Sequence, residues 1–241
     1  GFCSIKKNFS TGFWLKMTIK KIKQLWNEGK TPIIVGGTGL YFKALTDGLV
    51  DIPDIPYSLR KEVRKLHDTI GQKKFFERLI KLDSLSKKYI LPSDSQRSLR
   101  AYEVKKFTNK SLFKFIKKTQ PNFNKKIFIK LFINSPKELL HTKIETRVER
   151  MFKDGAVNEV QNFFKIRVKK EMSSNKIIGI REIKAYLQKK STLTETKELI
   201  KQKTRQYAKR QFTWARGHMK SWKMIYSSNI NDLYKKAINK I

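Results

Sequence analysis

The stretch Thr31-Pro32-Ile33-Ile34-Val35-Gly36-Gly37-Thr38-Gly39 decides the fold class of this chain. Its first part, residues 31–35, is a short apolar run without alternation, which predicts a strand buried on both faces of a parallel sheet. Three glycines follow within residues 36–39, and they predict a tight turn in which a ligand can approach the backbone closely. A helical pattern resumes after the turn. Buried strand, glycine-rich turn and helix together indicate an α/β fold.

The residues before this strand, 11–28, carry the apolar stripe of an amphipathic helix. Gly29 follows them, and glycine is common just past the end of a helix. The predicted helix therefore packs one face against the core and ends before the strand begins. The stripe consists of Leu15, Ile19, Ile22 and Trp26.

A boundary marked by prolines at residues 51–56 separates the α/β pattern from a segment with a different sequence pattern. Residues 57–118 read as short, very basic helices without a strand-like run. A second strand is predicted at residues 127–133, and the chain after it is mostly helical. We therefore predict that residues 1–52 form part of an α/β core, residues 53–123 a helical insertion, and residues 124–241 the return to the core with C-terminal helices.

The second predicted strand leads into a helix with its own start signal. In Ser135-Pro136-Lys137-Glu138, serine as N-cap, proline at the first helical position and glutamate at the third form a capping box. The expected buried face of that helix consists of Leu140, Ile144, Val148 and Met151.

Composition limits the class of partner. The chain has 241 residues, and 55 Lys+Arg against 20 Asp+Glu leave a formal charge of +35. Such an excess favours a polyanion, above all nucleic acid, although a lysine-rich proteome would explain part of it. No apolar run of about 18 residues and no signal peptide is visible, so we expect a cytoplasmic protein without a membrane partner. Cys3 is the only cysteine, which excludes an intrachain disulfide.

Two features suit a phosphate-containing ligand. The turn at residues 36–39 follows a predicted strand and opens a helix, a context that directs backbone N–H groups and the Thr38 hydroxyl toward an anion. Arg147 lies beside the apolar stripe of the capped helix, where a guanidinium could bind pyrophosphate in a bidentate manner. Taken alone, each has an ordinary alternative, a turn without a ligand and a surface arginine.

Two further segments suit RNA. Arg97 and Arg100 lie on one helical face, although Arg100 could instead pair with Glu103. The stretch from Thr204 to Arg216 interleaves cations with aromatic side chains, which can hold phosphates and stack on unpaired bases. Its alternative is an aromatic core with a solvated basic face. The three histidines have no spacing that suits a metal site.

Together and in order, these segments resemble the tRNA dimethylallyltransferase family, also called tRNA isopentenyltransferases. The resemblance extends over roughly residues 9–217. It rests on residues 32–41, 94–104, 147–151, 178–182 and 204–216, with Gly48, Gly155, Tyr186 and Leu187 between them.

This resemblance implies a P-loop-NTPase-like parallel-sheet core with a helical insertion and a helical C-terminal region. It implies transfer of a dimethylallyl group from its diphosphate to N6 of adenosine 37 in tRNA, after that base is flipped out of the anticodon loop. The partners would be the tRNA anticodon stem-loop and dimethylallyl diphosphate, with Mg²⁺ on the diphosphate. The enzyme would be a monomer.

The resemblance also assigns roles to residues. Thr38 and Arg147 would be catalytic, and Gly36, Gly37, Thr38 and Arg147 would hold the diphosphate. The segments that contact tRNA in the family correspond here to Arg60, Gln96, Arg97, Ser98, Leu99, Arg100, Lys176, Ile177, Ile178, Gly179, Ile180, Arg181, Lys209, Arg210, Gln211, Phe212, Thr213, Trp214, Ala215 and Arg216.

Two parts of the family pattern do not occur in these 241 residues. They are an N-terminal Gly-x-Thr-x-x-Gly-Lys-Ser/Thr loop for the diphosphate and an Asp-Ser segment whose aspartate is the general base. We therefore expect an N-terminally truncated member, inactive by itself. Two alternatives stay open at this point: a non-catalytic RNA-binding protein, and an isopentenyltransferase that acts on free adenylate.

Overall fold

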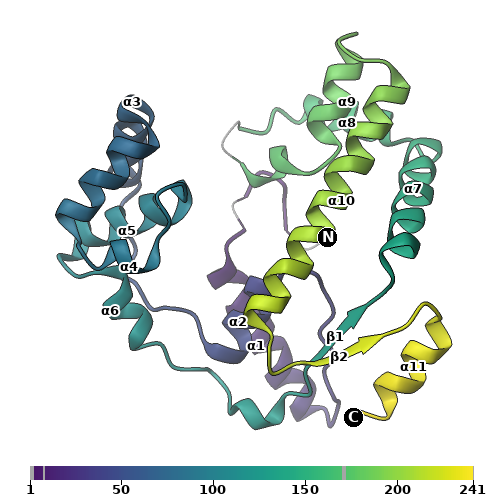
Figure 1. The fold of residues 1–241 in the computed structure, drawn as a ribbon, viewed down its shortest axis with the longest axis horizontal. Coiled ribbons are helices and arrows are strands. Elements are labelled where there is room, and N and C mark those ends of the chain that lie inside the picture. The colour runs from purple at the N-terminus through teal and green to yellow at the C-terminus, as the bar shows by residue number, and fades with distance from the viewer. Residues whose placement is uncertain (1–2, 8, 170–171, 241) are drawn as a thin grey trace. The chain divides into compact units, whose positions relative to one another are not determined.

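The computed structural model describes residues 3–7, 9–169 and 172–240 (Figure 1). The chain divides into two compact units. The outer unit consists of Gly1–Lys43 and Lys125–Ile241, and the inserted unit consists of Ala44–Asn124. The sequence predicts three segments instead, with boundaries after residues 52 and 123. That three-part division stays a prediction.

The outer unit is mainly helical around one small sheet. Strands β1 and β2 are parallel, and the register pairs Leu131 with Lys223 and Asn134 with Tyr226. Its helices and strands are α1 (Thr11–Asn27), the start of α2 (Gly39–Asp47), β1 (Leu131–Asn134), α7 (Lys137–Lys153), α8 (Ala156–Lys165), α9 (Ile180–Leu187), α10 (Leu193–His218), β2 (Lys223–Tyr226) and α11 (Ile230–Ile238), with short 3-10 turns η1 (Lys125–Ile127) and η2 (Ser173–Lys176).

Helix α1 confirms the predicted helix over residues 11–28. The hydroxyl of Ser10 accepts a hydrogen bond from the Phe13 backbone N–H at 3.1 Å and so caps the first turn. Leu15 and Ile22 are buried, as the apolar stripe predicts. Gly29 has a φ of 68°, a left-handed conformation that glycine adopts without strain just past the helix end.

The predicted strand at residues 31–35 is wrong. This segment is not a strand, and the Ile33 and Val35 side chains are 83% and 89% exposed. A strand requires a neighbour to satisfy its backbone N–H and C=O groups. In the part of the chain that the structure describes, β1 and β2 pair with each other and neither pairs with residues 31–35. The turn and the helix after it do form, because α2 begins at Gly39.

The second predicted strand is shorter than expected, and its capped helix starts differently. Only residues 131–134 of this region are strand, and residues 125–127 form a 3-10 turn instead. Helix α7 begins at Lys137, which leaves Pro136 as the N-cap without a side-chain hydrogen bond. The predicted capping box is therefore wrong, because Ser135 lies one residue too early. On the expected face Ile144 and Val148 are buried.

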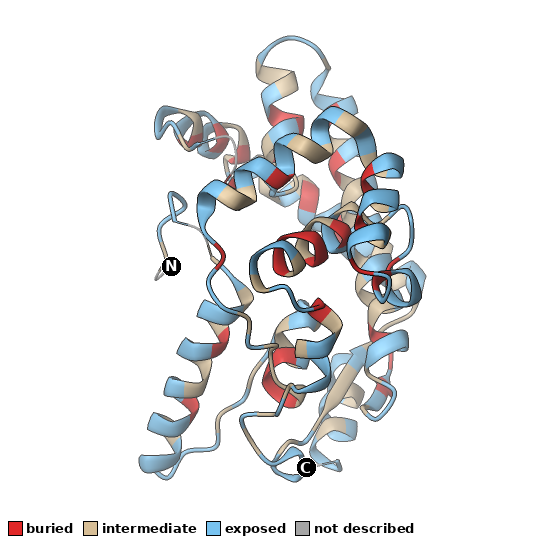
Figure 2. Cartoon of the chain, turned by 90° about the vertical axis from the view of Figure 1, so that its left-hand side faces the viewer, coloured by how far each residue is buried: buried red, intermediate tan, exposed pale blue. Residues whose placement is uncertain are grey.

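The core of the outer unit lies where α7, α8, α9 and α10 meet. Figure 2 marks the buried residues of the chain in red; those on these helices form one cluster, and Met151 packs against it. The cluster consists of Val148, Ala156, Val160, Ile183 and Ile200. It holds the first half of α10 against the neighbouring helices.

The inserted unit is helical, as the sequence predicts. Helix α3 (Tyr57–Leu82) is bent at Gly71, whose φ is 74°, and α4 (Ser86–Tyr89), α5 (Ser95–Thr108) and α6 (Leu112–Lys117) pack with it. Its core consists of Ile55, Val63, Phe75, Leu79, Ile90, Ala101, Tyr102, Val104 and Leu112. No helix in the described residues has both the length and the apolar character to cross a bilayer.

Candidate substrate-binding site

The glycine loop, residues 36–39, lies at the start of α2. Thr38 is exposed, and its C=O accepts a hydrogen bond from the Tyr41 N–H at 3.0 Å, so it ends the loop and begins the helix. The first N–H groups of a helix have no partner within it and carry a partial positive charge. The loop thus lies at a helix start, as the sequence predicts, and its binding of an anion stays a prediction.

Two side chains of α10 hold this loop. The Nε2 of Gln211 donates a hydrogen bond to the Gly37 C=O at 2.9 Å. The Trp214 ring packs so closely on Gly39 that a Cβ at residue 39 would overlap it. The loop thus touches the one segment that interleaves cations and aromatics, from which 174 residues of sequence separate Gly37.

The aromatic side chains of α10 have protein partners. The Trp214 indole stacks on the His218 ring, with centroids 4.4 Å apart and planes 10° apart. Phe212 faces Phe132 of β1 at 6.1 Å, and the Arg216 guanidinium lies over the Phe212 ring at 5.1 Å. The Tyr207 ring is more exposed, and the Arg210 guanidinium lies over it, 5.8 Å from the ring centroid. Phe212 and Trp214 are half-buried against other side chains, Tyr207 is exposed, and the choice between core and base stacking stays open.

The cations in the second half of α10 are exposed. Lys209, Thr213 and Arg216 are spaced i, i+4 and i+7 and are all exposed, so they form one stripe along the second half of the helix. Ala215 is buried and supports the packing instead. Gln206, Tyr207 and Arg210 of the same segment are exposed as well.

Ion pairs join α7 to α10. Glu149 lies 2.6 Å from the Lys197 Nζ and 2.9 Å from the Lys201 Nζ, and hydrogen bonds from these two ammonium groups lower the pKa of the Glu149 carboxyl to about 2. Glu145 lies 3.6 Å from an Arg205 nitrogen. Arg147 is exposed between these two glutamates, and within the described residues no contact joins it to the glycine loop.

The segment at residues 176–181 is fixed by a buried glutamate. Glu182 of α9 is 5% exposed, and its carboxylate accepts the Gly179 N–H at 2.7 Å and a hydrogen bond from Lys203 of α10. Burial raises the pKa of Glu182, but the hydrogen bonds from Lys203 and the backbone outweigh it, so the pKa is lowered. Lys176 and Arg181 remain exposed on either side.

The remaining predicted RNA residues lie in the inserted unit, Arg60 on α3 and the others at the start of α5. Asp94 caps α5 by accepting the Arg97 N–H at 2.9 Å, and its other oxygen pairs with the Arg97 side chain at 2.8 Å. Arg100 lies 3.6 Å from Glu103, which is the ion pair that the sequence left open. Ser98 is fully buried and supports α5 rather than facing a polyanion. Gln96 and Arg97 are exposed.

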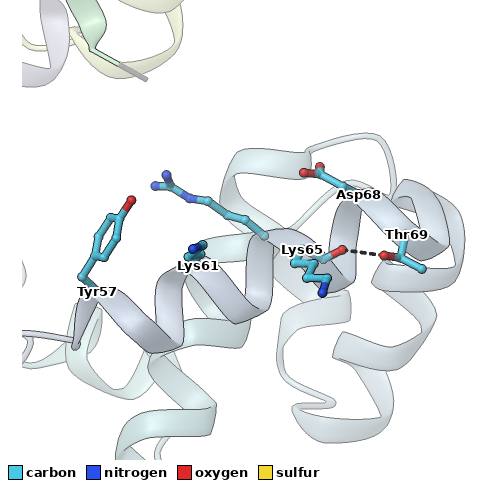
Figure 3. Close-up of a pocket in the computed structure, with 6 residues that line it drawn as sticks. Tyr57, Lys61, Lys65, Asp68 and Thr69 are labelled. Atoms are coloured by element: carbon cyan, nitrogen blue, oxygen red, sulfur yellow. Dashed lines mark hydrogen bonds between the residues drawn. The ribbon is translucent and has the colours of Figure 1, made fainter. Parts of the chain in front are cut away.

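A shallow pocket on α3 adds cations that the sequence analysis missed (Figure 3). It has a volume of about 440 Å³ and is lined by Tyr57, Lys61, Arg64, Lys65, Asp68 and Thr69. The spacing of Lys61, Arg64 and Lys65 on one helical face was the signal that could have found it. Nearby, the Nε of Arg60 is buried without a hydrogen-bond partner in the described part of the chain.

Among the described residues, no three His, Cys, Asp or Glu side chains come together to hold a metal ion.

Comparison with known proteins identifies the family. The family model described as IPP transferase matches residues 1–218. The chain is 48% identical to the tRNA dimethylallyltransferase of Pelagibacter ubique (strain HTCC1062) over 98% of its own length and 75% of that protein. It is 42% identical to the tRNA dimethylallyltransferase of Rickettsia bellii (strain OSU 85-389), over 96% of its length and 73% of that protein.

Two solved structures also match this chain. The tRNA delta(2)-isopentenylpyrophosphate transferase of Staphylococcus epidermidis matches with a TM-score of 0.60 at 30% identity, over 99% of this chain and 79% of that one. A eukaryotic dimethylallyltransferase acting on tRNA matches in fold, with a TM-score of 0.78 at 22% identity, over 99% of this chain and 62% of that one. These matches confirm the predicted α/β, P-loop-NTPase-like fold class. The chain therefore belongs to the IPP transferase family, as the order of its sequence motifs predicts.

Proposed function

We propose that this chain, a tRNA-modifying prenyltransferase, transfers a dimethylallyl group from dimethylallyl diphosphate to N6 of adenosine 37. The observation that carries the proposal is the 48% identity to a tRNA dimethylallyltransferase over nearly the whole chain. The contacts of Gln211 and Trp214 with the glycine loop support it, because they join the loop that we assign to the diphosphate to the helix that we assign to RNA. The partners would be the anticodon stem-loop and the diphosphate, with the enzyme acting as a cytoplasmic monomer.

In the proposed reaction, N6 of the adenine forms a bond to C1 of the dimethylallyl group while the bond from C1 to the diphosphate oxygen breaks. Pyrophosphate leaves with the bonding electrons, and N6 loses one proton to a base. Negative charge grows on the departing group, so donors aimed at it lower the barrier. The backbone N–H groups at residues 36–39, the Thr38 hydroxyl and the Arg147 guanidinium are the donors that we assign to this task.

Magnesium belongs to this proposal only as a partner of the diphosphate, where it would offset charge. No step depends on a protein-held ion.

RNA binding would use cationic and polar side chains of both units. We assign it to Lys209, Arg210, Thr213 and Arg216 of α10, to Lys176 and Arg181, and to Arg60, Gln96, Arg97 and Arg100 of the inserted unit. Each cation that neutralises a phosphate releases counterions, so the affinity for tRNA falls steeply as salt rises.

The test uses the full-length gene product with tRNA that lacks the modification and with dimethylallyl diphosphate. We expect dimethylallyladenosine at position 37, detected by mass spectrometry of the digested tRNA. Salt-dependent tRNA binding without product would support a non-catalytic RNA-binding protein instead. Product formed with adenosine monophosphate in place of tRNA would support an adenylate isopentenyltransferase.

A further inference from the structure

The bend in α3 brings together two side chains that a straight helix would keep apart. His67 and Gln72 are five residues apart, which would place them about 140° apart around an uninterrupted helix. At Gly71, between them, φ is 74° and ψ is 164°, so the helix is interrupted there. The His67 Nε2 consequently lies 3.0 Å from the Gln72 Oε1. Nothing lies within 4 Å of the position of a Cβ on Gly71, so glycine is required there by its backbone conformation and not by space.

The amide of Gln72 bridges from α3 to the start of α5. Its Nε2 lies 2.6 Å from the Pro92 carbonyl oxygen and 3.3 Å from the Ser98 Oγ. A carbonyl oxygen only accepts hydrogen bonds, so the amide nitrogen must face Pro92 and the flipped orientation of the amide is excluded. Gln72 therefore uses its N–H groups on the α5 side and leaves its oxygen as an acceptor.

This orientation fixes a proton on His67. Because the Gln72 Oε1 accepts, the His67 Nε2 must donate and carries a hydrogen. An edge-to-face contact with the fully buried Phe75, with ring centroids 5.1 Å apart, holds the imidazole in place. The other ring nitrogen, Nδ1, lies 3.4 Å from the Asp68 carboxylate, a long contact to a side chain that is 82% exposed. His67 thus fixes the Gln72 amide from the side opposite α5.

The network continues to groups that we assign to RNA. The hydroxyl of Ser98, a fully buried residue, donates to the Asp94 C=O at 2.7 Å. Asp94 caps α5 and pairs with the Arg97 side chain, as described above. Gln72 is therefore bonded to residues 92 and 98, one before and one after the first turn of α5. Gln96 and Arg97 lie between these two bonds and are exposed.

We propose that Gln72 and His67 are positioning residues for RNA binding, which hold the start of α5 so that Gln96 and Arg97 meet tRNA in a fixed arrangement. This inference rests on the proposed function, in which the start of α5 binds tRNA. Neither Gln72 nor His67 touches RNA: Gln72 acts through α5, and His67 acts through Gln72. A backbone that is already fixed loses less conformational freedom on binding, which raises the affinity.

The proton on His67 is tested first, in the full-length gene product without substrate. Nitrogen-15 NMR of the imidazole reports which nitrogen is protonated, and His67→Phe assigns the signal. We expect a hydrogen-bonded Nε2 proton in wild type that is lost through exchange with water in Gln72→Met. A ring protonated only at Nδ1 would overturn the network.

Binding is tested with Gln72→Met, since methionine keeps the length of the side chain but cannot donate a hydrogen bond. We expect the Kd for tRNA to rise about two- to tenfold, the effect of about one lost hydrogen bond, while the KM for dimethylallyl diphosphate changes less than about twofold. Gln161→Met is the matched control, at an exposed position of α8 that forms no side-chain hydrogen bond within the described residues. It should change neither constant.

A background without the two exposed side chains separates positioning from general support of the fold. In Gln96→Ala/Arg97→Ala, adding Gln72→Met should raise the Kd by less than about twofold, because the groups that Gln72 positions are gone. An equal rise in both backgrounds, or no rise in the wild-type background, overturns the proposal.

Circular dichroism and melting temperature check that each variant is folded. If Gln72→Met does not fold, His67→Phe takes its place in both backgrounds, because it keeps a ring against Phe75 and loses only the donor to Gln72. Failure of the proposed function would appear separately, as absence of prenyl transfer by the wild-type protein with the His67 signal unaffected.

Discussion

The indole of Trp214 occupies the space that a side chain on residue 39 would need. This relationship predicts a specific genetic interaction. Gly39→Ala should displace the ring and disturb the loop, with a cost of about 1–3 kcal/mol from overpacking, seen as a lower melting temperature and a higher KM for dimethylallyl diphosphate. In the double variant Gly39→Ala/Trp214→Ala the clash is absent, so it should be no worse than Trp214→Ala alone. Additive losses in the double variant would contradict this reading of the contact.

The Glu149 carboxylate predicts a pH-dependent stability. Its pKa falls from 4.5 to about 2 through the hydrogen bonds from Lys197 and Lys201. A carboxyl whose pKa is lowered by folding stabilises the native state fully above its unfolded pKa and loses that contribution as the pH falls toward its native pKa. Glu149→Gln should therefore melt below wild type at pH 7, and the gap should narrow as the pH falls from about 5 toward about 2.

The control for Glu149 is Glu77→Gln. Glu77 is an exposed glutamate of α3 that forms no ion pair within the described residues. Its melting temperature should stay close to that of wild type over the same pH range. A gap for Glu149→Gln that does not depend on pH would show that the ion pairs with α10 do not stabilise the fold.

Glu182 predicts a graded loss of stability. Glu182→Ala leaves the buried Gly179 N–H and the Lys203 ammonium without their acceptor, and we expect a loss of about 2–4 kcal/mol in chemical denaturation. Glu182→Gln keeps an oxygen for the Gly179 N–H and loses only the charge, so it should cost less than the alanine variant. Equal losses would mean that the Gly179 hydrogen bond contributes nothing.

Two glycines predict opposite effects of the same substitution. Gly48 has a φ of 92°, and a Cβ there would overlap the Gln120 C=O, so Gly48→Ala should destabilise the inserted unit by about 1–3 kcal/mol. Gly217 lies within α10 with open space around it, so Gly217→Ala should stabilise by about 0.5–1 kcal/mol. Thermal melts of both variants check the signs. A destabilised Gly217→Ala variant would contradict the helical conformation of residue 217, the next-to-last residue of α10.

Local patterns predicted the helices well and the strands poorly. The stripe with Leu15 and Ile22 found α1 to within one residue at its end, because helical hydrogen bonds form within the segment itself. Residues 31–35 have the composition of a buried strand, yet Ile33 and Val35 are exposed. Pairing depends on a neighbouring strand, and composition does not encode where that neighbour lies.

The candidate site was predictable by residue type but not by orientation. The sequence placed Gln211 and Trp214 in an RNA segment because their neighbours are cationic. Only the fold shows that their side chains contact Gly37 and Gly39, far away along the chain. The Arg100–Glu103 pair was foreseeable from its i, i+3 spacing. The burial of Ser98 follows from packing in the inserted unit, which the sequence does not reveal.

Helix α10 has 26 residues, about 39 Å of continuous helix, and ion pairs fix its first half while the glycine loop depends on its second. The rotation of the second half of α10 about the helix axis, relative to its first half, therefore decides whether the loop contacts form. One residue inserted between Lys203 and Gln211 would turn everything after it by about 100° and carry both loop contacts out of reach, although the helix itself would survive. Substitutions along α10 should therefore be tolerated more easily than insertions or deletions between its two ends.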